Sequence, residues 1–387
     1  MRNPLSQKIV DIAPSGIRKF FDVAAERENV ISLGVGEPDF DTPLKVREVG
    51  IKTLEEGKTS YTSNAGLQEL RDEIARYLKR RLQLSYDPKQ EILVTVGGSE
   101  AIDLALRCML DTGDEVLLPQ PCYVSYEPCI IMADGVCVSI PLQSTNDFKL
   151  KAEELADAFT PRTKILILSF PNNPTGSVMT REDLLPIAEF AIQHDLYVIS
   201  DEIYSELTYG GDHVSIATLP GMWDRTVVIN GFSKGFAMTG WRLGYACGPR
   251  AIISEMLKLH QYAIMSAPTT SQYAAIEALR SCGAEVQEMR ASYDERRQFL
   301  MGEFKRLGLP CFEPFGAFYV FPCIKEFGMS SDEFANRLLD EENLAIVPGT
   351  AFGTSGEGFL RISYAYSIEE LKEAMRRLEH FIGKLRA

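Results

Sequence analysis

The 387-residue sequence predicts an α/β fold, in which a large domain with a mostly parallel sheet covered by helices is joined to a smaller α+β domain. Short apolar runs alternate with longer amphipathic stretches through the middle of the chain, as strands alternate with helices. The runs are nearly continuous in apolar residues, which is typical of strands buried on both faces of a parallel sheet. After about residue 290 this alternation gives way to capped helices and short β-like pieces.

The strands of the large domain are expected at residues 92–96, 116–118, 165–168, 197–199 and 227–229. Two helical patterns lie between them, at residues 99–110 and 180–194. The first carries apolar residues on one face, and the second opens with Thr180 and Asp183 in the positions of a capping box. In the C-terminal part, helices should begin after Ser330 and Ser367, with β-like pieces at residues 317–321 and 359–364.

The length of the chain predicts two domains, because single hydrophobic cores usually stop growing below this size. We expect residues 48–289 to form the large domain. Residues 1–47 together with residues 290–387 should form the small domain and an N-terminal arm.

The composition is that of an ordinary globular protein, with 45% hydrophobic and 24% charged residues. The net charge of −14 argues against nucleic acid or an anionic membrane as a partner. The sequence shows neither a secretory signal nor an apolar run that could span a membrane. Its 8 cysteines form no CxxC pair and its 4 histidines have no metal-ligand spacing, so we expect a cytoplasmic protein without a metal.

Chemically useful side chains follow four of the predicted strands. In open α/β sheets, ligands bind outside the carboxyl ends of the strands, so these segments indicate the site. They supply a glycine-rich helix start at Gly97-Gly98-Ser99, an amide at Asn173, an acid and a phenol at Asp201 and Tyr204, and a lysine at Lys234. Each of these residues alone is most often a cap, a turn or a surface group, but their conjunction predicts a site.

These residues suit different parts of one ligand. Backbone N–H groups at Gly98 and Ser99 would stabilise an anion at a helix N-terminus, and the forked cation of Arg242 suits a phosphate. Asp201 could hold a proton on a heterocyclic nitrogen, and Lys234 could form an imine with an aldehyde.

The remaining side chains suit the ring of the same ligand. Tyr204 and Asn173 could hydrogen-bond a ring oxygen, and Tyr123 could stack on a flat ring. A phosphate, a ring nitrogen, a phenolic oxygen and an aldehyde together describe pyridoxal phosphate.

With these motifs, the chain resembles the fold-type-I, class I pyridoxal-phosphate aminotransferases, the family of aspartate and aromatic aminotransferases. The resemblance extends over nearly the whole length. Besides the four strand-end motifs, it includes residues 31–43, Tyr61, and residues 66–71, 348–353 and 360–364.

The resemblance implies roles for the catalytic and substrate-binding residues. Lys234 resembles the lysine that binds the cofactor aldehyde and later moves the substrate's Cα proton. Asp201 resembles the carboxylate that keeps the ring nitrogen protonated, and Asn173 and Tyr204 resemble the pair that holds the 3′-oxygen. Arg361 resembles the residue that binds the substrate α-carboxylate, assisted by Asn173 and the Gly36 backbone.

The resemblance also implies the remaining cofactor contacts. Gly98, Ser99 and Arg242 match phosphate-binding positions, and Tyr123 occupies the stacking position. Tyr61 matches a phosphate contact that the neighbouring subunit donates in this family, which implies a homodimer with shared active sites.

Two positions depart from the family pattern. Many relatives carry Ser or Thr three residues before the lysine, where this chain has Gly231, so Ser233 is the candidate to supply the missing hydroxyl. Some acid-selective relatives place a lysine at the position of Ser99 to pair with a dicarboxylate side chain. An aromatic or other apolar amino donor therefore fits better, with glutamate and 2-oxoglutarate as the second pair.

The sequence thus predicts a pyridoxal-phosphate-dependent aminotransferase that moves an amino group from an L-amino acid to a 2-oxo acid by a ping-pong mechanism. A carbon–sulfur β-lyase would use the same cofactor and lysine. A non-catalytic sensor that binds pyridoxal phosphate is less well supported, because such proteins usually carry an added DNA-binding segment and this chain has no basic helix. A nicotinamide dehydrogenase is disfavoured because Gly34-Val35-Gly36 lacks the third glycine of the dinucleotide fingerprint.

Overall fold

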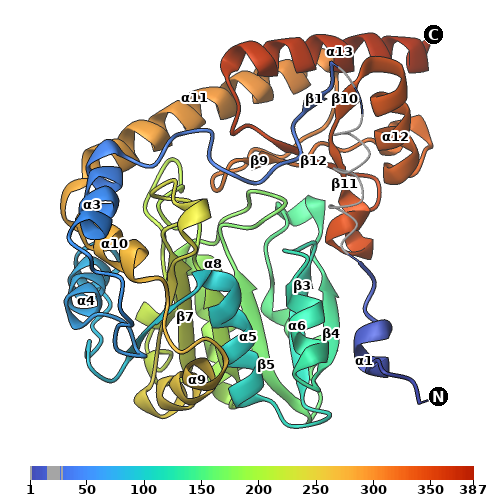
Figure 1. Ribbon diagram of the computed structural model, residues 1–387. Helices are drawn as coiled ribbons and strands as arrows, with labels where there is room; N and C mark the ends of the chain where they lie inside the picture. The colour runs from blue at the N-terminus through green and yellow to red at the C-terminus, as the bar shows by residue number, and fades with distance from the viewer. Residues whose placement is uncertain (1, 15–26, 28) are drawn as a thin grey trace.

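The computed structural model describes residues 2–14, 27 and 29–387 of the chain. A seven-stranded sheet with the strand order β2-β8-β7-β6-β5-β3-β4 forms the centre of the large domain (Figure 1). Neighbouring strands are parallel from β7 through β4, whereas β8 is antiparallel to both of its neighbours. The strands are β2 Ile92–Thr95, β3 Glu115–Gln120, β4 Val136–Pro141, β5 Thr163–Ser169, β6 Tyr197–Asp201, β7 Thr226–Gly231 and β8 Gly244–Cys247.

All five predicted strands are present, and the mostly parallel sheet is confirmed. The sequence patterns did not reveal β4 and β8. The edge strand β4 keeps several of its residues partly or fully exposed, so it lacks a continuous apolar run. The short β8 begins with Gly244 and contains Tyr245, which gives no clear strand pattern.

Helices cover both faces of this sheet. On β5, Ile165 and Ile167 contact the apolar cluster that includes Ala101 of α5, Ile130 of α6 and Ile253 of α9. The alternate residues of the strand belong to a second cluster, which also contains side chains of α7 and α8. The helices of the large domain are α3 Leu44–Glu55, α4 Gln68–Leu82, α5 Gly97–Met109, α6 Tyr126–Met132, α7 Ala152–Ala158, α8 Arg181–Gln193, α9 Arg250–Ala263 and α10 Thr269–Ser281.

The small domain carries two small sheets beneath long helices (Figure 1). Strand β1, Ile31–Ser32, pairs in parallel with β10, Leu344–Ala345, so a segment near the N-terminus joins the C-terminal part of the chain. The second sheet has the antiparallel order β11-β12-β9. The remaining elements are β9 Tyr319–Val320, β11 Val347–Pro348, β12 Leu360–Ser363, α1 Gln7–Val10, α11 Gly283–Leu307, α12 Ser331–Glu342 and α13 Ile368–Arg386.

The predicted helix caps are confirmed. Thr180 and Asp183 form a reciprocal capping box at the start of α8. Ser330 accepts the Glu333 N–H at the start of α12, and Ser367 caps α13.

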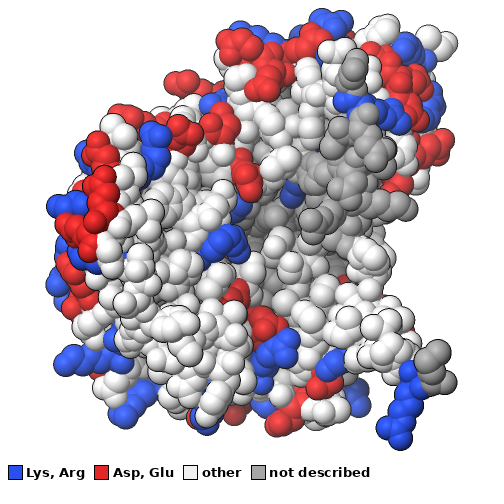
Figure 2. All heavy atoms as spheres, in the orientation of Figure 1, with Lys and Arg blue, Asp and Glu red and all other residues white. Residues whose placement is uncertain are grey.

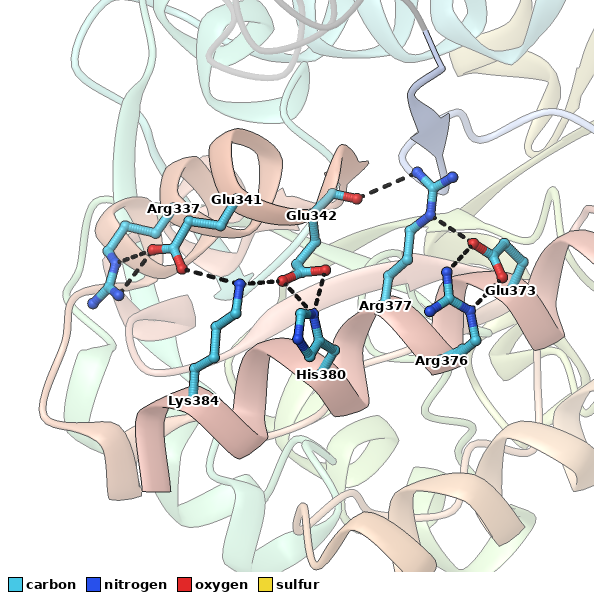
Figure 3. Close-up of polar contacts among 8 residues, drawn as sticks. All are labelled: Arg337, Glu341, Glu342, Glu373, Arg376, Arg377, His380 and Lys384. Carbon is cyan, nitrogen blue, oxygen red and sulfur yellow. Dashed lines mark hydrogen bonds and ion pairs between the residues drawn. The ribbon is translucent and has the colours of Figure 1, made fainter. Parts of the chain in front are cut away.

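Polar contacts on α13 tie β1 to the small domain (Figure 3). Arg377 donates to the backbone oxygens of Asn29 at 3.0 Å, Glu342 at 3.3 Å and Asn343 at 2.8 Å. The carboxylate of Glu342, the last residue of α12, accepts hydrogen bonds from His380 and Lys384 of α13. The chain that enters β1 is thereby held against the end of α12.

Both domain boundaries expected from the sequence fall within helices. Residue 47 lies in α3, which packs against α10 of the large domain, and residue 290 lies in the 25-residue helix α11. Helix α11 contacts α10 and α13, so it bridges the two parts of the molecule (Figure 1). The division at these residues stays a prediction.

Within the described residues, no helix combines the length and the apolarity that a membrane span requires.

Candidate active site

The parallel strands of the large sheet end at a common edge, and the segments after them carry the predicted site residues. Asp201 is the last residue of β6, Gly231 is the last of β7, and Asn173 and Lys234 follow β5 and β7 closely. Figure 2 shows that the face of the molecule in this view is hollowed between its lower and upper parts, with both basic and acidic side chains near the hollow. This arrangement is the usual position of a ligand site in an open α/β sheet.

The Asp201 carboxylate is buried, and its partners in the described structure are neutral. Its Oδ2 accepts from the Tyr126 hydroxyl at 2.7 Å, and its Oδ1 accepts from the Ile203 N–H at 3.2 Å. Tyr126 also lies 2.8 Å from Ser169 Oγ. Burial raises the pKa of Asp201 to about 6, although the hydrogen bond from Tyr126 opposes the shift. A cationic N–H group placed against this carboxylate would favour its ionised form.

Aromatic side chains lie next to this carboxylate. The ring of the half-buried Tyr123 meets Tyr126 edge to face, with the centroids 5.6 Å apart. Tyr123 packs against Tyr126, which in turn donates to Asp201. Its ring is therefore in a suitable place to stack on a flat ring that Asp201 would hold.

Lys234 contacts residues from both parts of the chain. Its Nζ donates to the backbone oxygen of Gly36 and lies 5.8 Å from the ring centroids of Tyr204 and Phe318. Burial lowers the pKa of the Lys234 amine to about 8; the Glu37 carboxylate opposes this shift, and the Arg361 guanidinium reinforces it. A lysine with this pKa carries a substantial fraction of free amine near neutral pH, as a nucleophile or a general base requires.

Arg361, on β12, is a buried cation whose guanidinium is only partly hydrogen-bonded by the described residues. Its Nη1 donates to Asn173 Oδ1 at 3.1 Å and its Nη2 donates to the Gly34 oxygen. The guanidinium lies between the rings of Tyr319 and Phe352, 4.6 and 4.7 Å from their centroids. In the part of the chain that the structure describes, the buried Nε has no hydrogen-bond partner. An anion that reaches this group would gain a charge-assisted hydrogen bond.

The N-terminus of α5 and Arg242 lie side by side, as the expected anion site requires. The N-cap residue Val96 has no side-chain oxygen, so it leaves the N–H groups of Gly98 and Ser99 uncapped. The Arg242 guanidinium lies over this turn, because a Cβ at Gly97 would stand 2.9 Å from Arg242 Nη2. Ser99 and Arg242 are exposed to solvent, as residues that receive a phosphate from outside should be.

The structure gives a packing reason for Gly231. It pairs with Gly244 between β7 and β8, and a Cβ at Gly231 would lie 3.0 Å from the Gly244 Cα and 3.0 Å from the Leu243 oxygen. A serine or threonine at residue 231 would therefore crowd the backbone of β8. The half-buried Ser233 remains available as the substitute hydroxyl that the sequence suggested.

Tyr126 and Tyr319 belong to this site but were missed from the sequence. The Tyr319 hydroxyl lies 2.8 Å from the Tyr204 hydroxyl, and its ring stacks on Arg361, so it touches both the cofactor side and the substrate side. Tyr319 lies in an apolar segment, where a tyrosine usually indicates core, and Tyr126 lies between Ser125 and Glu127, where no pattern marks it as a site residue. The only signal in the sequence is general: the hydroxyl of a tyrosine needs a hydrogen-bond partner when it is buried.

The remaining predicted residue, Tyr61, does not join this cluster within one chain. Its side chain lies on the surface with 79% of its area exposed. Its expected role requires a second subunit.

The arrangement fits pyridoxal phosphate. A buried carboxylate without a cationic partner in the described residues suits the protonated ring nitrogen, and the turn at Gly97 under Arg242 suits the phosphate. The amine of Lys234 suits the aldehyde. A two-domain α/β chain with these groups at one sheet edge defines the class of fold-type-I pyridoxal-phosphate enzymes.

Comparison with known proteins identifies the family. The model of the family "Aminotransferase class I and II" matches residues 28–378, and the chain belongs to this family. It is 52% identical to a putative aminotransferase of Bacillus subtilis (strain 168), over 99% of this chain and 100% of that protein. It is 48% identical to an aspartate aminotransferase of Pyrococcus abyssi, over 97% of each chain. The solved aromatic aminotransferase from Pyrococcus horikoshii OT3 is 44% identical, with a TM-score of 0.91 over 96% of this chain and 100% of that one.

The protein is therefore a pyridoxal-phosphate-dependent aminotransferase with the fold-type-I architecture. The fold class, cofactor and type of reaction expected from the sequence are confirmed.

We predict that Arg361→Ala lowers kcat/KM for amino acid and 2-oxo acid substrates by at least about tenfold, because one charge-assisted hydrogen bond is worth about 1.5–3 kcal/mol. Cofactor binding should stay near that of the wild type, since Arg361 is expected to bind the substrate carboxylate and not the cofactor. Steady-state kinetics and cofactor absorbance measure the two effects. Arg376→Ala, a change at an exposed arginine of α13, is the matched control. An unchanged kcat/KM in the Arg361 variant would remove this residue from the site.

Proposed function

We propose that the enzyme transfers the amino group of an L-amino acid with an aromatic or other apolar side chain to a 2-oxo acid, with glutamate and 2-oxoglutarate as the second pair. The observation that carries this proposal is the buried Arg361, whose Nε lacks a partner among the described residues and which donates to the same backbone segment, residues 34–36, as the Lys234 amine. Arg361 and Asn173 bind the α-carboxylate, and the Gly36 backbone lines the same place. Ser99 offers no cation to a second carboxylate, which favours an apolar side chain.

When bound, pyridoxal phosphate supplies an electron sink for the charge that develops at the substrate Cα. Asp201 keeps the ring nitrogen protonated, and this role fits its burial and its neutral partners. Tyr204 and Asn173 hold the ring oxygen, and burial raises the pKa of Tyr204 well above its usual value, so its hydroxyl remains a hydrogen-bond donor. Lys234 takes the Cα proton and returns it on the cofactor side, as general base and then general acid. Gly98, Ser99, Ser233 and Arg242 hold the phosphate, and Tyr123 stacks on the ring.

The substrate proposal predicts the outcome of a half-reaction screen. The holoenzyme is mixed with one amino acid at a time in the absence of an oxo acid, and the change in cofactor absorbance is followed. Phenylalanine, tyrosine and glutamate should convert about one cofactor per site and then stop, and aspartate should react more slowly, because nothing pairs with its side chain near Ser99.

The same screen separates the alternatives. Lys234→Ala is the control and should show no conversion with any amino acid. Continuous release of ammonia without an oxo acid would instead identify a β-lyase, and the absence of conversion in the wild type would identify a binding protein. Aspartate reacting fastest would overturn the proposed substrate class.

We propose that two copies of the chain form a dimer with shared sites and that Tyr61 reaches the phosphate of the partner. Thr269 donates to the Ser60 oxygen at 2.8 Å, so the start of α10 lies next to the Tyr61 segment, and α3 packs against α10. Large apolar side chains are exposed on α3 and just before α10, and exposed apolar side chains that gather on a surface often mark protein interfaces. These residues are Leu44, Ile51 and Leu54 on α3, and Tyr262, Ile264 and Met265 before α10. The eight free cysteines are consistent with a cytoplasmic, reducing location.

Mixing two defective variants tests the shared site. Tyr61→Ala should weaken cofactor binding, and Lys234→Ala should abolish turnover. In a mixed dimer, one site would combine both lesions and the other would be intact, so activity should reappear at limiting cofactor. Unfolding and refolding the variants together, and separately as the control, measures the gain. If the mixture shows only the sum of the two separate activities, Tyr61 does not act across the interface.

A further inference from the structure

A buried carboxylate–imidazole pair lies directly behind the anion site. Glu100, in the first turn of α5, accepts the Val96 N–H through Oε2. Its Oε1 lies 2.6 Å from Nδ1 of His260, which stands in the last turn of α9. His260 is completely buried, and 12% of the Glu100 side chain is exposed.

The direction of this contact follows from the chemistry of the groups. An ionised carboxylate only accepts hydrogen bonds, so His260 donates from Nδ1 and the backbone donates from Val96. Within the described chain, the other ring nitrogen of His260 is buried without a partner, so Glu100 is the polar contact of the imidazole. The pair therefore links the end of α9 to the turn that opens α5.

This link has a consequence for the turn. A helix whose N-cap residue is valine has no side-chain oxygen that could accept the N–H groups of its first turn. Here the Glu100 carboxylate, four residues further along, holds the N-cap N–H instead. The N–H groups of Gly98 and Ser99 stay available to a ligand, while the turn that carries them is tethered to α9.

The same carboxylate carries a negative charge close to the place where an anion should bind, and like charges disfavour each other. The Nδ1–H of His260 donates to Oε1, the carboxylate oxygen that Val96 does not contact. This hydrogen bond partly neutralises the carboxylate charge and thereby reduces its repulsion of the anion. A buried carboxylate without this donor would oppose the phosphate and strain the turn.

We propose that Glu100 and His260 are positioning residues for the cofactor phosphate. Glu100 fixes the first turn of α5, and His260 orients the Glu100 carboxylate and offsets its negative charge. The proposal rests on the proposed role of Gly98, Ser99 and Arg242 as phosphate ligands. Neither residue touches the cofactor, and both act through the turn.

The test compares two ligands of the cofactor-free full-length enzyme, pyridoxal phosphate and pyridoxal, which lacks the phosphate. The ratio of their dissociation constants isolates the contribution of the phosphate, and a general loss of structure would change both constants together. His260→Leu should lower the preference for pyridoxal phosphate by about five- to tenfold, the size expected for a charge effect at a helix N-terminus. The dissociation constant for pyridoxal should change by less than about twofold.

A second variant tests the charge argument. Glu100→Gln in the His260→Leu background removes the uncompensated carboxylate but keeps an oxygen for the Val96 N–H. It should fold even if His260→Leu alone does not, because no unpaired buried charge remains. Its preference for pyridoxal phosphate should return to within about twofold of the wild type.

Two further variants serve as references. His380→Leu breaks a solvent-exposed histidine–glutamate pair between α13 and Glu342 of α12, far along the chain from the anion site, and should leave the preference unchanged (Figure 3). Arg242→Ala should lower it, and an unchanged preference in that variant would overturn the proposed phosphate site itself. If Arg242→Ala lowers the preference while His260→Leu leaves it unchanged, or if the double variant stays low, the inference about Glu100 and His260 is wrong.

Discussion

The active site depends on one short segment, residues 34–36, whose carbonyl oxygens hold two cations. Arg361 donates to the Gly34 oxygen and Lys234 donates to the Gly36 oxygen, and a buried cation needs such acceptors. The segment follows β1, which pairs with β10 and is tied to α13 through Arg377. The attachment of this N-terminal strand to the small domain therefore places the Gly34 and Gly36 oxygens between Arg361, on β12, and Lys234, which follows β7.

Burial shifts the pKa values of two groups in this site, and each shift suits the expected ligand. It raises the pKa of Asp201 and lowers that of Lys234, because each loses solvent without gaining a full counter-charge within the described chain. A protonated ring nitrogen and an α-carboxylate would supply the missing counter-charges at Asp201 and Arg361, and the neutral amine that burial favours at Lys234 is the form that reacts with an aldehyde. The cofactor and substrate therefore complete an electrostatic arrangement that the folded chain leaves open.

Local sequence patterns predicted five of the seven strands of the large sheet, the helix caps and the residues that follow the strand ends, because each depends on a few neighbouring residues. The contacts that support the site could not be predicted in this way. Tyr126 meets Asp201 across 75 positions, and His260 meets Glu100 across 160. Such pairs are brought together only by the complete fold. The helices α3 and α11 continue across the residues at which the sequence suggested domain boundaries, so no local pattern marks a boundary there.

The most direct test of this account is the titration of the Lys234 amine in the cofactor-free enzyme. Reductive methylation over a range of pH, with quantitation of each lysine by mass spectrometry, reports the fraction of free amine. Because burial favours the neutral form, Lys234 should reach half of its maximal reactivity near pH 8. Ordinary surface lysines, with a pKa of about 10.4, should still gain reactivity well above that pH. A Lys234 that titrates together with the surface lysines would contradict the account.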